Sequence, residues 1–177
     1  ERALAHQPGH ALALANRAVL EYQAGQLGAA LQSAAAAAIA PEPMLLGNLG
    51  ALLGAARQTR PAEQWLRRAE RLQPRNPLWA LNRGNAYHLA GRDDEALEAY
   101  ASASLSGEHL VATHYGEALA LWARGQRTEA LEKLREAERL APADPEVLNN
   151  LGCMHFALGH HETAQQREQQ QAAQVGG

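Results

Sequence analysis

A pattern of small and aromatic residues recurs every 34 residues along this chain, and this period constrains the fold more than any other feature. It is clearest in the stretch 76–108, where the pattern consists of Gly84, Gly91, Ala96, Tyr100 and Ala103. Asn76 is suited to cap a first helix, Gly91 ends that helix, and acidic residues after Arg92 favour the start of a second. Such a helical hairpin cannot bury both of its faces alone, so it needs copies of itself on each side.

The copies are present in register. One step forward, the equivalent places hold Ala118, Gly125, Ala130, Leu134 and Ala137, and one step backward they include Gly50, Ala62, Leu66 and Ala69. The step back to the first unit is two residues shorter. We expect five hairpin units, at about 11–42, 43–76, 77–110, 111–144 and 145–177. Residues 1–10 have the pattern of the end of an upstream unit, so we interpret the chain as a fragment of a longer protein.

A 34-residue helical hairpin with this order of small and aromatic residues resembles the tetratricopeptide repeat (TPR) family. The resemblance covers nearly the whole chain and implies an all-α fold, a right-handed superhelical solenoid of five TPR-like hairpins. In such a solenoid the first helices line a concave groove and the second helices form the outer surface. Tyr100 should then be a core residue shared between hairpins. The last helix, from His161 to about Val175, is rich in Gln and is expected to be a polar cap.

Length and composition limit the number of domains and the classes of protein to which the chain could belong. The chain has 177 residues and a net charge of −3, which is enough for one solenoid and too short for two domains of average size. No apolar run approaches the roughly 20 residues of a membrane span, so membrane insertion is not expected. Cys153 is the only cysteine and leaves the compartment, cytoplasmic or periplasmic, undetermined. Abundant Ala, Arg and Gly favour a bacterial source.

The expected groove is lined by one stripe of the first helices, and this stripe contains our candidate binding residues. We call the following ten residues the first-helix stripe: Asn16, Tyr22, Asn48, Asn82, Asn85, His88, Leu119, Trp122, Asn150 and Phe156. Four of its asparagines recur at equivalent places, interrupted only by Gly116. This row resembles the asparagine ladder in the TPR region of O-linked N-acetylglucosamine transferases, where amides would pair with the backbone of an extended peptide. The alternative is that these asparagines tie neighbouring helices together.

Aromatic residues recur farther along the same stripe, at Tyr22, His88, Trp122 and Phe156, with Gly54 expected to form a notch between them. Because Leu121 fills the adjacent core place, the indole of Trp122 should turn towards the groove and bury little surface in the free protein. Leu81 is expected on the groove side as well. The groove lacks the basic residues with which some TPR receptors hold the terminal carboxylate of chaperone tails.

Catalytic, metal and cofactor chemistry is not indicated. The densest titratable cluster is His155, His160, His161 and Glu162, whose spacing does not place two imidazoles on one helix face as a metal site requires. His109 and His114 flank a repeat boundary without an acid or nucleophile at a suggestive spacing. No phosphate-binding loop, dinucleotide motif or serine elbow occurs, so we expect no enzyme activity and no cofactor.

Arginines gather between residues 57 and 75, with Glu63 and Glu70 interspersed. They form either a patch for an anionic partner or a solvated outer face with ion pairs along the helix, and the second interpretation is favoured. Nucleic-acid binding is not expected, because the chain is slightly negative and lacks stacking aromatics beside a basic surface.

The sequence thus predicts a protein-binding module whose groove accepts an extended or helical peptide segment of a protein partner. Two alternatives remain. The solenoid could be the substrate-positioning arm of a larger enzyme such as a glycosyltransferase, or a scaffold that associates with copies of itself.

Overall fold

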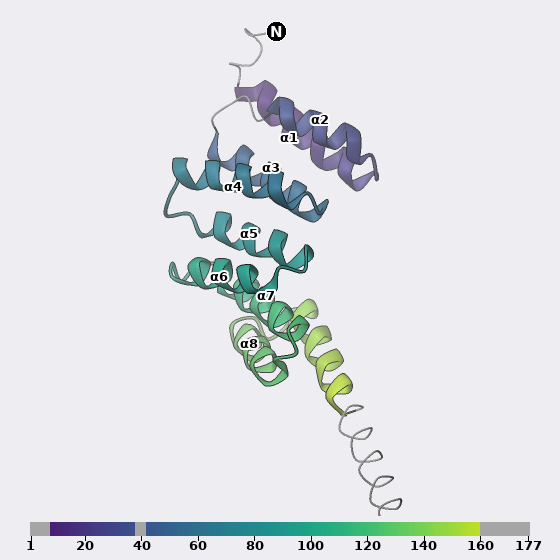
Figure 1. The fold of residues 1–177 in the computed structure, drawn as a ribbon, viewed down its shortest axis with the longest axis vertical. Helices are drawn as coiled ribbons and strands as arrows, with labels where there is room; N and C mark the ends of the chain where they lie inside the picture. Colours follow the sequence, from purple (N-terminus) through teal and green to yellow (C-terminus); the bar gives the residue numbers. More distant parts are fainter. Residues whose placement is uncertain (1–7, 38–41, 160–177) are drawn as a thin grey trace, which may run out of the picture.

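The computed structural model describes residues 8–37 and 42–159, and its regular structure in these ranges is entirely helical. Eight helices form four hairpins: α1 (Pro8–Gln23) with α2 (Leu27–Ala37), α3 (Pro43–Ala55) with α4 (Thr59–Leu72), α5 (Pro77–Leu89) with α6 (Asp93–Ser104), and α7 (Leu110–Ala123) with α8 (Arg127–Leu140). A further helix spans 145–159. The hairpins stack one after another as a helical solenoid (Figure 1), which confirms the expected all-α class. The expected cap at His161–Val175 lies outside the described residues.

Two helices start as their sequences predict. The Asn76 side chain accepts a hydrogen bond of 3.0 Å from the backbone N–H of Leu78, with Pro77 as the first residue of α5. The Asp144 carboxylate accepts bonds from the backbone N–H groups of Glu146 and Val147, at 2.9 and 3.1 Å, at the start of helix 145–159. Each cap satisfies donors that have no partner within the helix.

The turn inside each hairpin requires a residue with a left-handed backbone. Gly25, Gly91 and Gly125 supply it in three hairpins, with φ between +73° and +79°. In the hairpin of α3 and α4 the same place is occupied by Arg57, with φ of +58°. Glycine adopts this conformation at no steric cost, whereas a residue with a Cβ does not. Arg57 is therefore a strained substitute for the glycine of the other turns.

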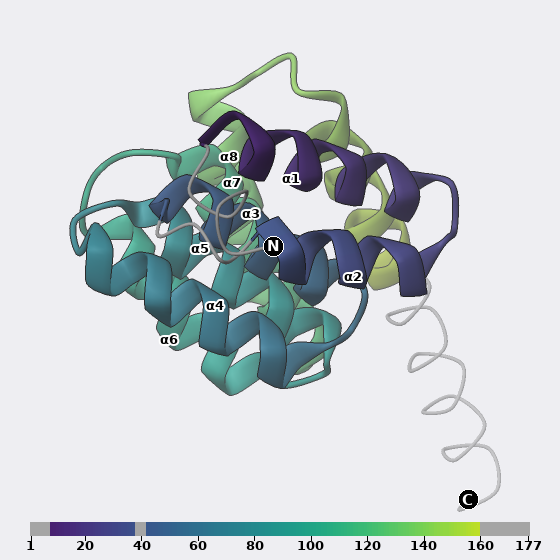
Figure 2. The same ribbon diagram turned by 90° about the horizontal axis from the view of Figure 1, so that it is seen from above.

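Successive hairpins contact one another in two ways, first helix against first helix and second helix against the next first helix. α3 packs against α1 and α5, and α5 packs against α7, while α4 and α6 each pack against the first helix of the following hairpin. Seen from above, first and second helices form two layers that turn gradually along the stack (Figure 2). Each second helix is thus buried between two first helices on its inner side and reaches solvent on its outer side.

Large side chains in this core fit against glycines of the first helices. Tyr100 is 1% exposed, and its ring lies between α5 and α7, where a Cβ built at Gly84 or Gly116 would come within 2.5 or 2.6 Å of ring atoms. Tyr100 is therefore the shared core residue that its place in the repeat predicts. Trp79, also 1% exposed, fills the space above Gly47, where a Cβ would lie 1.9 Å from the indole.

Candidate functional site

None of the ten residues of the first-helix stripe is buried, and all of them lie in the described part of the chain. Asn16, Asn48, Asn85 and Phe156 are exposed, and the other six are half-buried. The stripe follows the first helices from α1 to helix 145–159. It is thus accessible along the stack, although its members differ in how far they are already engaged within the protein.

The asparagines fall into two groups. Asn16, Asn48 and Asn82 make no side-chain hydrogen bond to the described part of the chain. Asn150 donates to the Tyr115 hydroxyl at 3.0 Å and to the Glu146 carbonyl at 2.9 Å, so it ties helix 145–159 to α7. Asn85 accepts a 2.8 Å bond from the Tyr100 hydroxyl. Asn150 therefore fits the interpretation that the row ties neighbouring helices together, whereas Asn16, Asn48 and Asn82 do not bridge the described helices through their amides.

The interruption of the asparagine row at Gly116 has a packing cause. Any Cβ at residue 116 would lie 2.6 Å from Cζ of Tyr100, which is too close for a non-bonded contact. One repeat earlier, Leu66 replaces Tyr100 and Asn82 replaces Gly116. One repeat later, Leu134 replaces Tyr100 and Asn150 replaces Gly116. A ring at this junction leaves no room for the asparagine that a leucine permits.

The expectation that Trp122 buries little surface in the free protein is wrong. Its indole is half-buried and packs against the core cluster that includes Leu134, Val147 and Met154. The guanidinium of Arg127 lies 5.8 Å from the ring centroid, within cation–π range. Trp122 therefore packs against a core cluster to which α7, α8 and helix 145–159 all contribute, and it also belongs to the stripe.

Two further expectations for the groove are corrected. Gly54 does not form an open notch: it is buried, and a Cβ there would lie 2.7 Å from the Cβ of Ala86, because α3 and α5 approach closely at this point. Leu81 is 6% exposed and belongs to the core. By contrast, Phe156 is 71% exposed, and His88 is half-buried with its Nδ1 2.6 Å from the Asp93 carboxylate.

Charge is distributed unequally between the two layers. The first helices, including 145–159, carry five Asp, Glu, Lys or Arg residues, and α3 carries none. The second helices carry eighteen. In α5 and α7, moreover, the charged residues are paired: Arg83 with Glu70 at 2.7 Å, and Glu117 with Lys133 at 3.1 Å. The first-helix side thus presents a surface almost free of unpaired charge.

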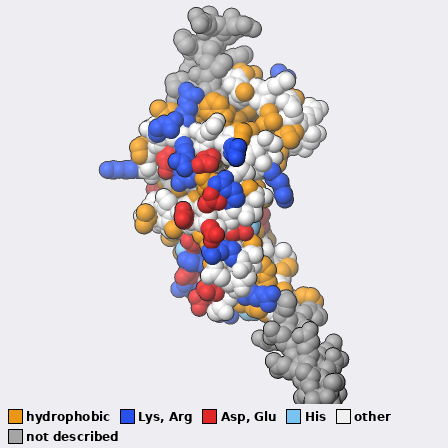
Figure 3. Space-filling model, viewed as in Figure 1, with side chains coloured by type: hydrophobic (Ala, Val, Ile, Leu, Met, Phe, Trp, Pro, Cys, Tyr) orange, Lys and Arg blue, Asp and Glu red, His pale blue; other side chains and the backbone are white. Residues whose placement is uncertain are grey.

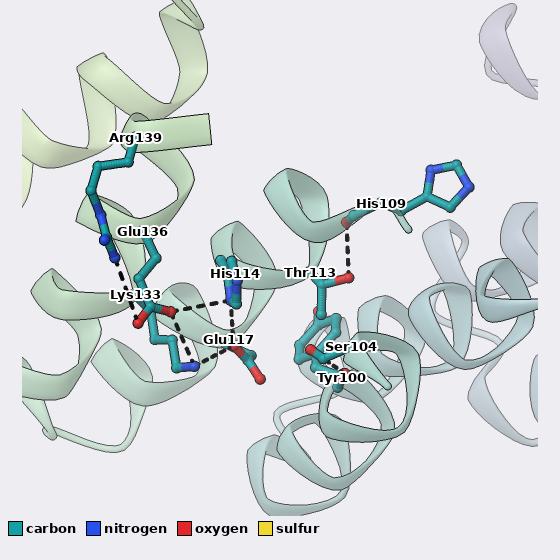
Figure 4. Close-up of polar contacts among 9 residues, drawn as sticks. All are labelled: Tyr100, Ser104, His109, Thr113, His114, Glu117, Lys133, Glu136 and Arg139. Carbon is teal, nitrogen blue, oxygen red and sulfur yellow. Dashed lines mark hydrogen bonds and ion pairs between the residues drawn. The ribbon is translucent and has the colours of Figure 1, made fainter. Parts of the chain in front are cut away.

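One charged cluster was not foreseen from the sequence. Between α7 and α8, His114 Nδ1 lies 3.0 Å from Glu117 and 3.5 Å from Glu136, and Lys133 Nζ lies 3.1 and 3.3 Å from the same two carboxylates (Figure 4). Burial disfavours the ammonium, but the two carboxylates overcome this and raise the pKa of Lys133. The signal was the pair His114 and Glu117, three residues apart on one face of a helix. The contact joins α7 to α8.

Neither metal binding nor a membrane span is indicated in the described residues. No group of three or more His, Cys, Asp and Glu side chains there is arranged to hold a metal ion. No helix in these ranges has the length and apolarity needed to cross a membrane. His160, His161 and Glu162 of the histidine cluster lie outside the described residues.

The fold is shared with solved structures of low sequence identity. The Thermus thermophilus protein TTC0263, described as a thermophilic TPR protein, superposes with a TM-score of 0.70 at 24% identity, over 88% of this chain and 86% of that one. MamA from Desulfovibrio magneticus RS-1 superposes with a TM-score of 0.65 at 19% identity, over 89% and 90%. The first TPR domain of human RPAP3 gives 0.56 at 17% identity, over 89% and 98%.

Sequence comparison gives the family directly. Among curated proteins, no match was found. The family model for the tetratricopeptide repeat, however, matches residues 48–107 and 115–174, which together make up more than half of the chain. The period of 34 residues, the stacked hairpins and this match agree, and the chain belongs to the tetratricopeptide repeat family.

Proposed function

We propose that the first-helix stripe binds an extended or helical peptide segment of a protein partner. The observation that supports this most directly concerns Asn16, Asn48 and Asn82. They occupy the same place on three consecutive first helices, reach solvent and have no side-chain hydrogen bond to the described residues. An amide offers a donor and an acceptor together, so this row can pair with the backbone of a partner whatever its sequence.

The surroundings of the row favour an uncharged, apolar partner segment. α3 carries no charged residue, and two apolar side chains of the first helices, Met44 of α3 and Leu89 of α5, are 50% and 39% exposed. Phe156 is exposed at the far end of the stripe. An exposed aromatic that becomes buried on binding is the kind of residue that dominates binding energy. None of the ten stripe residues is a Ser, Thr, Cys or Lys nucleophile, so we propose binding and not catalysis.

Peptide binding by Asn48→Ala/Asn82→Ala tests the proposal. An array of random 15-residue peptides would first select ligands of the parent protein, and fluorescence anisotropy would then measure their dissociation constants. Loss of two amides should weaken most selected peptides about tenfold, because the net contribution of a hydrogen bond is about 0.5–1.5 kcal/mol. The rank order of the peptides should not change, since the amides pair with backbone groups.

Asn150→Ala is the matched control, because that amide is already bonded to Tyr115 and Glu146. It should lower the melting temperature and leave binding per folded molecule unchanged. Phe156→Ala is a better test of an apolar binding anchor than Trp122→Ala, because Trp122 also packs against the core. Selected peptides that bind the double variant as tightly as the parent would rule out the proposed role of the row.

A further inference from the structure

The outer surface of α4 carries an excess of positive charge that the fold does not neutralise. We call the following six residues the arginine face: Arg57, Arg60, Arg67, Arg68, Arg71 and Arg75. The same stretch, 57–75, contains only two acidic residues, so it has a net charge of +4 in a chain whose total is −3. Figure 3 shows basic side chains gathered over α4, on the outer side of the stack.

Both acidic residues of this stretch are already engaged. Glu70 pairs with Arg83 of α5 at 2.7 Å and so is used by the neighbouring hairpin. Glu63 pairs with Arg67 at 2.8 Å. Although partial burial opposes ionisation, hydrogen bonds from Tyr87 and Arg67 lower the pKa of the Glu63 carboxyl. Neither carboxylate therefore balances the remaining arginines.

Only Arg67 of the six arginines has an ionic partner in the part of the chain that the structure describes. Arg68 lies over the ring of Trp65, 5.5 Å from its centroid. The other four are exposed and have no ionic partner there: Arg57, Arg60, Arg71 and Arg75. Arg67 and Arg71 are separated by four residues on α4, the spacing at which like charges face each other on a helix and repel. This repulsion is a cost that a bound anionic group would relieve.

The equivalent helix α8 shows that such an excess is not a general property of the second helices. It has the same length as α4, 14 residues, but carries four basic and four acidic side chains. Its Lys133 and Arg139 both reach Glu136, at 3.3 and 3.9 Å. The favoured expectation for the arginines, a solvated face with ion pairs along the helix, describes α8 fully. In α4 it accounts for the pair Arg67 and Glu63 but not for the excess of positive charge.

We propose that the arginine face binds a short acidic segment of a polypeptide, at a site separate from the first-helix stripe. Guanidinium groups pair bidentately with carboxylates, which makes arginine suited to such a ligand. A helix of 14 residues is about 21 Å long, which matches an extended segment of about six or seven residues. The site therefore fits a cluster of Asp and Glu side chains within one short stretch.

The neighbouring helix favours an acidic segment over a nucleic acid or a membrane. α6 lies on the same outer side and presents acidic side chains, of which Asp94 is 79% exposed and Glu98 is exposed. A nucleic-acid backbone or an anionic bilayer is a long, continuous surface of negative charge, and it would meet these carboxylates within about one Debye length. A segment no longer than α4 avoids that repulsion.

Binding of a fluorescein-labelled peptide of seven glutamates tests the proposal, with a peptide of seven glutamines as the uncharged probe. At about 50 mM salt, where surface charges are weakly screened, the protein should bind the glutamate peptide saturably and the glutamine peptide not at all. Arg60→Gln/Arg71→Gln should weaken binding at least about fivefold, the loss expected for two exposed charge pairs. Neither arginine has a partner to lose, so melting should be unchanged.

Arg135→Gln/Arg139→Gln on α8 is the matched control, because it removes the same amount of positive charge from a helix that has no excess of it. It should change the dissociation constant less than about twofold. Arg57→Gln/Arg75→Gln repeats the test outside the helix, should the first variant melt early. Equal losses in the α4 and α8 variants would overturn the proposal, as would failure of the glutamate peptide to bind. Tighter binding of a 20-base-pair duplex or of phosphatidylserine vesicles in the same buffer would also overturn it.

Discussion

Ala34 in the first hairpin and Tyr100 in the third occupy the same place of the repeat, and both are almost fully buried, at 2% and 1% exposure. The Tyr100 ring reaches from its own hairpin to the next and contacts Gly84 and Gly116, and its hydroxyl bonds to Asn85. At Ala34 the two hairpins meet around a cavity of about 10 Å³, which is lined by alanines of α1 and α2, such as Ala18 and Ala34, and by leucines of α3, such as Leu45. This volume is at the lower limit for one water molecule.

The difference shows that side chains facing each other at a junction between hairpins have complementary sizes. It also shows that the junctions differ in how much they stabilise the stack. Where the second helix supplies a ring, the next first helix supplies Gly116; where it supplies Leu134 or Ala34, the next first helix carries Asn150 or Asn48. An aromatic side chain buries roughly 150–250 Å², and apolar burial contributes about 25 cal/mol per Å². The Tyr100 junction should therefore hold its neighbours more strongly than the Ala34 junction.

Tyr100→Ala is the largest test, because it gives the third hairpin the residue of the first. We expect a loss of about 3–5 kcal/mol in the free energy of unfolding, as for large aromatic truncations in cores, measured by urea denaturation. Ala34→Gly is the control truncation and should cost about 2 kcal/mol, the sum of one methyl group and the helix propensity of glycine. If Tyr100→Ala stays within about 0.5 kcal/mol of the parent protein, the comparison fails.

Gly116→Asn tests whether the side-chain sizes at this junction are complementary, since it places an asparagine where the Tyr100 ring leaves no room for one. The new side chain would meet Tyr100, so we expect a loss of about 1–3 kcal/mol. In Tyr100→Leu/Gly116→Asn the junction acquires the residues found at Leu134 and Asn150. The double variant should therefore be more stable than the two single changes predict, by about 1 kcal/mol or more in a double-mutant cycle. Additive losses would show that the two places are independent.

The sequence predicted the parts of the fold that depend on the period. Tyr100 was assigned to the core because the repeat places it between hairpins, and Asn76 was assigned as a cap because its neighbours fix the start of a helix. The burial of Trp79 against Gly47 was missed, since the two residues lie on first helices of different hairpins and outside the main periodic places. Periodicity gives the position of a residue on its helix but not the distance to the next helix.

The same limit explains the errors in the candidate site. Trp122 was placed in the open because Leu121 fills the core place of α7, yet its indole packs against the core cluster to which α7, α8 and helix 145–159 contribute. Gly54 was expected to leave a notch, but Ala86 approaches it from α5. Both errors arose from treating each first helix as a separate surface. Whether the stripe and the arginine face bind partners stays a prediction.

The comparison extends to the turns, and Arg57→Gly gives the smallest expected effect. The two hairpins that meet at Tyr100 turn at Gly91 and Gly125. The hairpin that packs against Ala34 turns at Arg57, with φ of +58°. Glycine relieves the left-handed strain but loses more entropy on folding, so the net gain in unfolding free energy should be about 0.5–1 kcal/mol. Gly91→Arg is the reciprocal control and should cost a similar amount, because a Cβ there meets no atom within 4 Å and only the backbone conformation opposes it. Urea denaturation of the two variants beside the parent measures both changes. A loss of stability in Arg57→Gly would mean that the arginine side chain contributes more to this turn than its backbone strain costs.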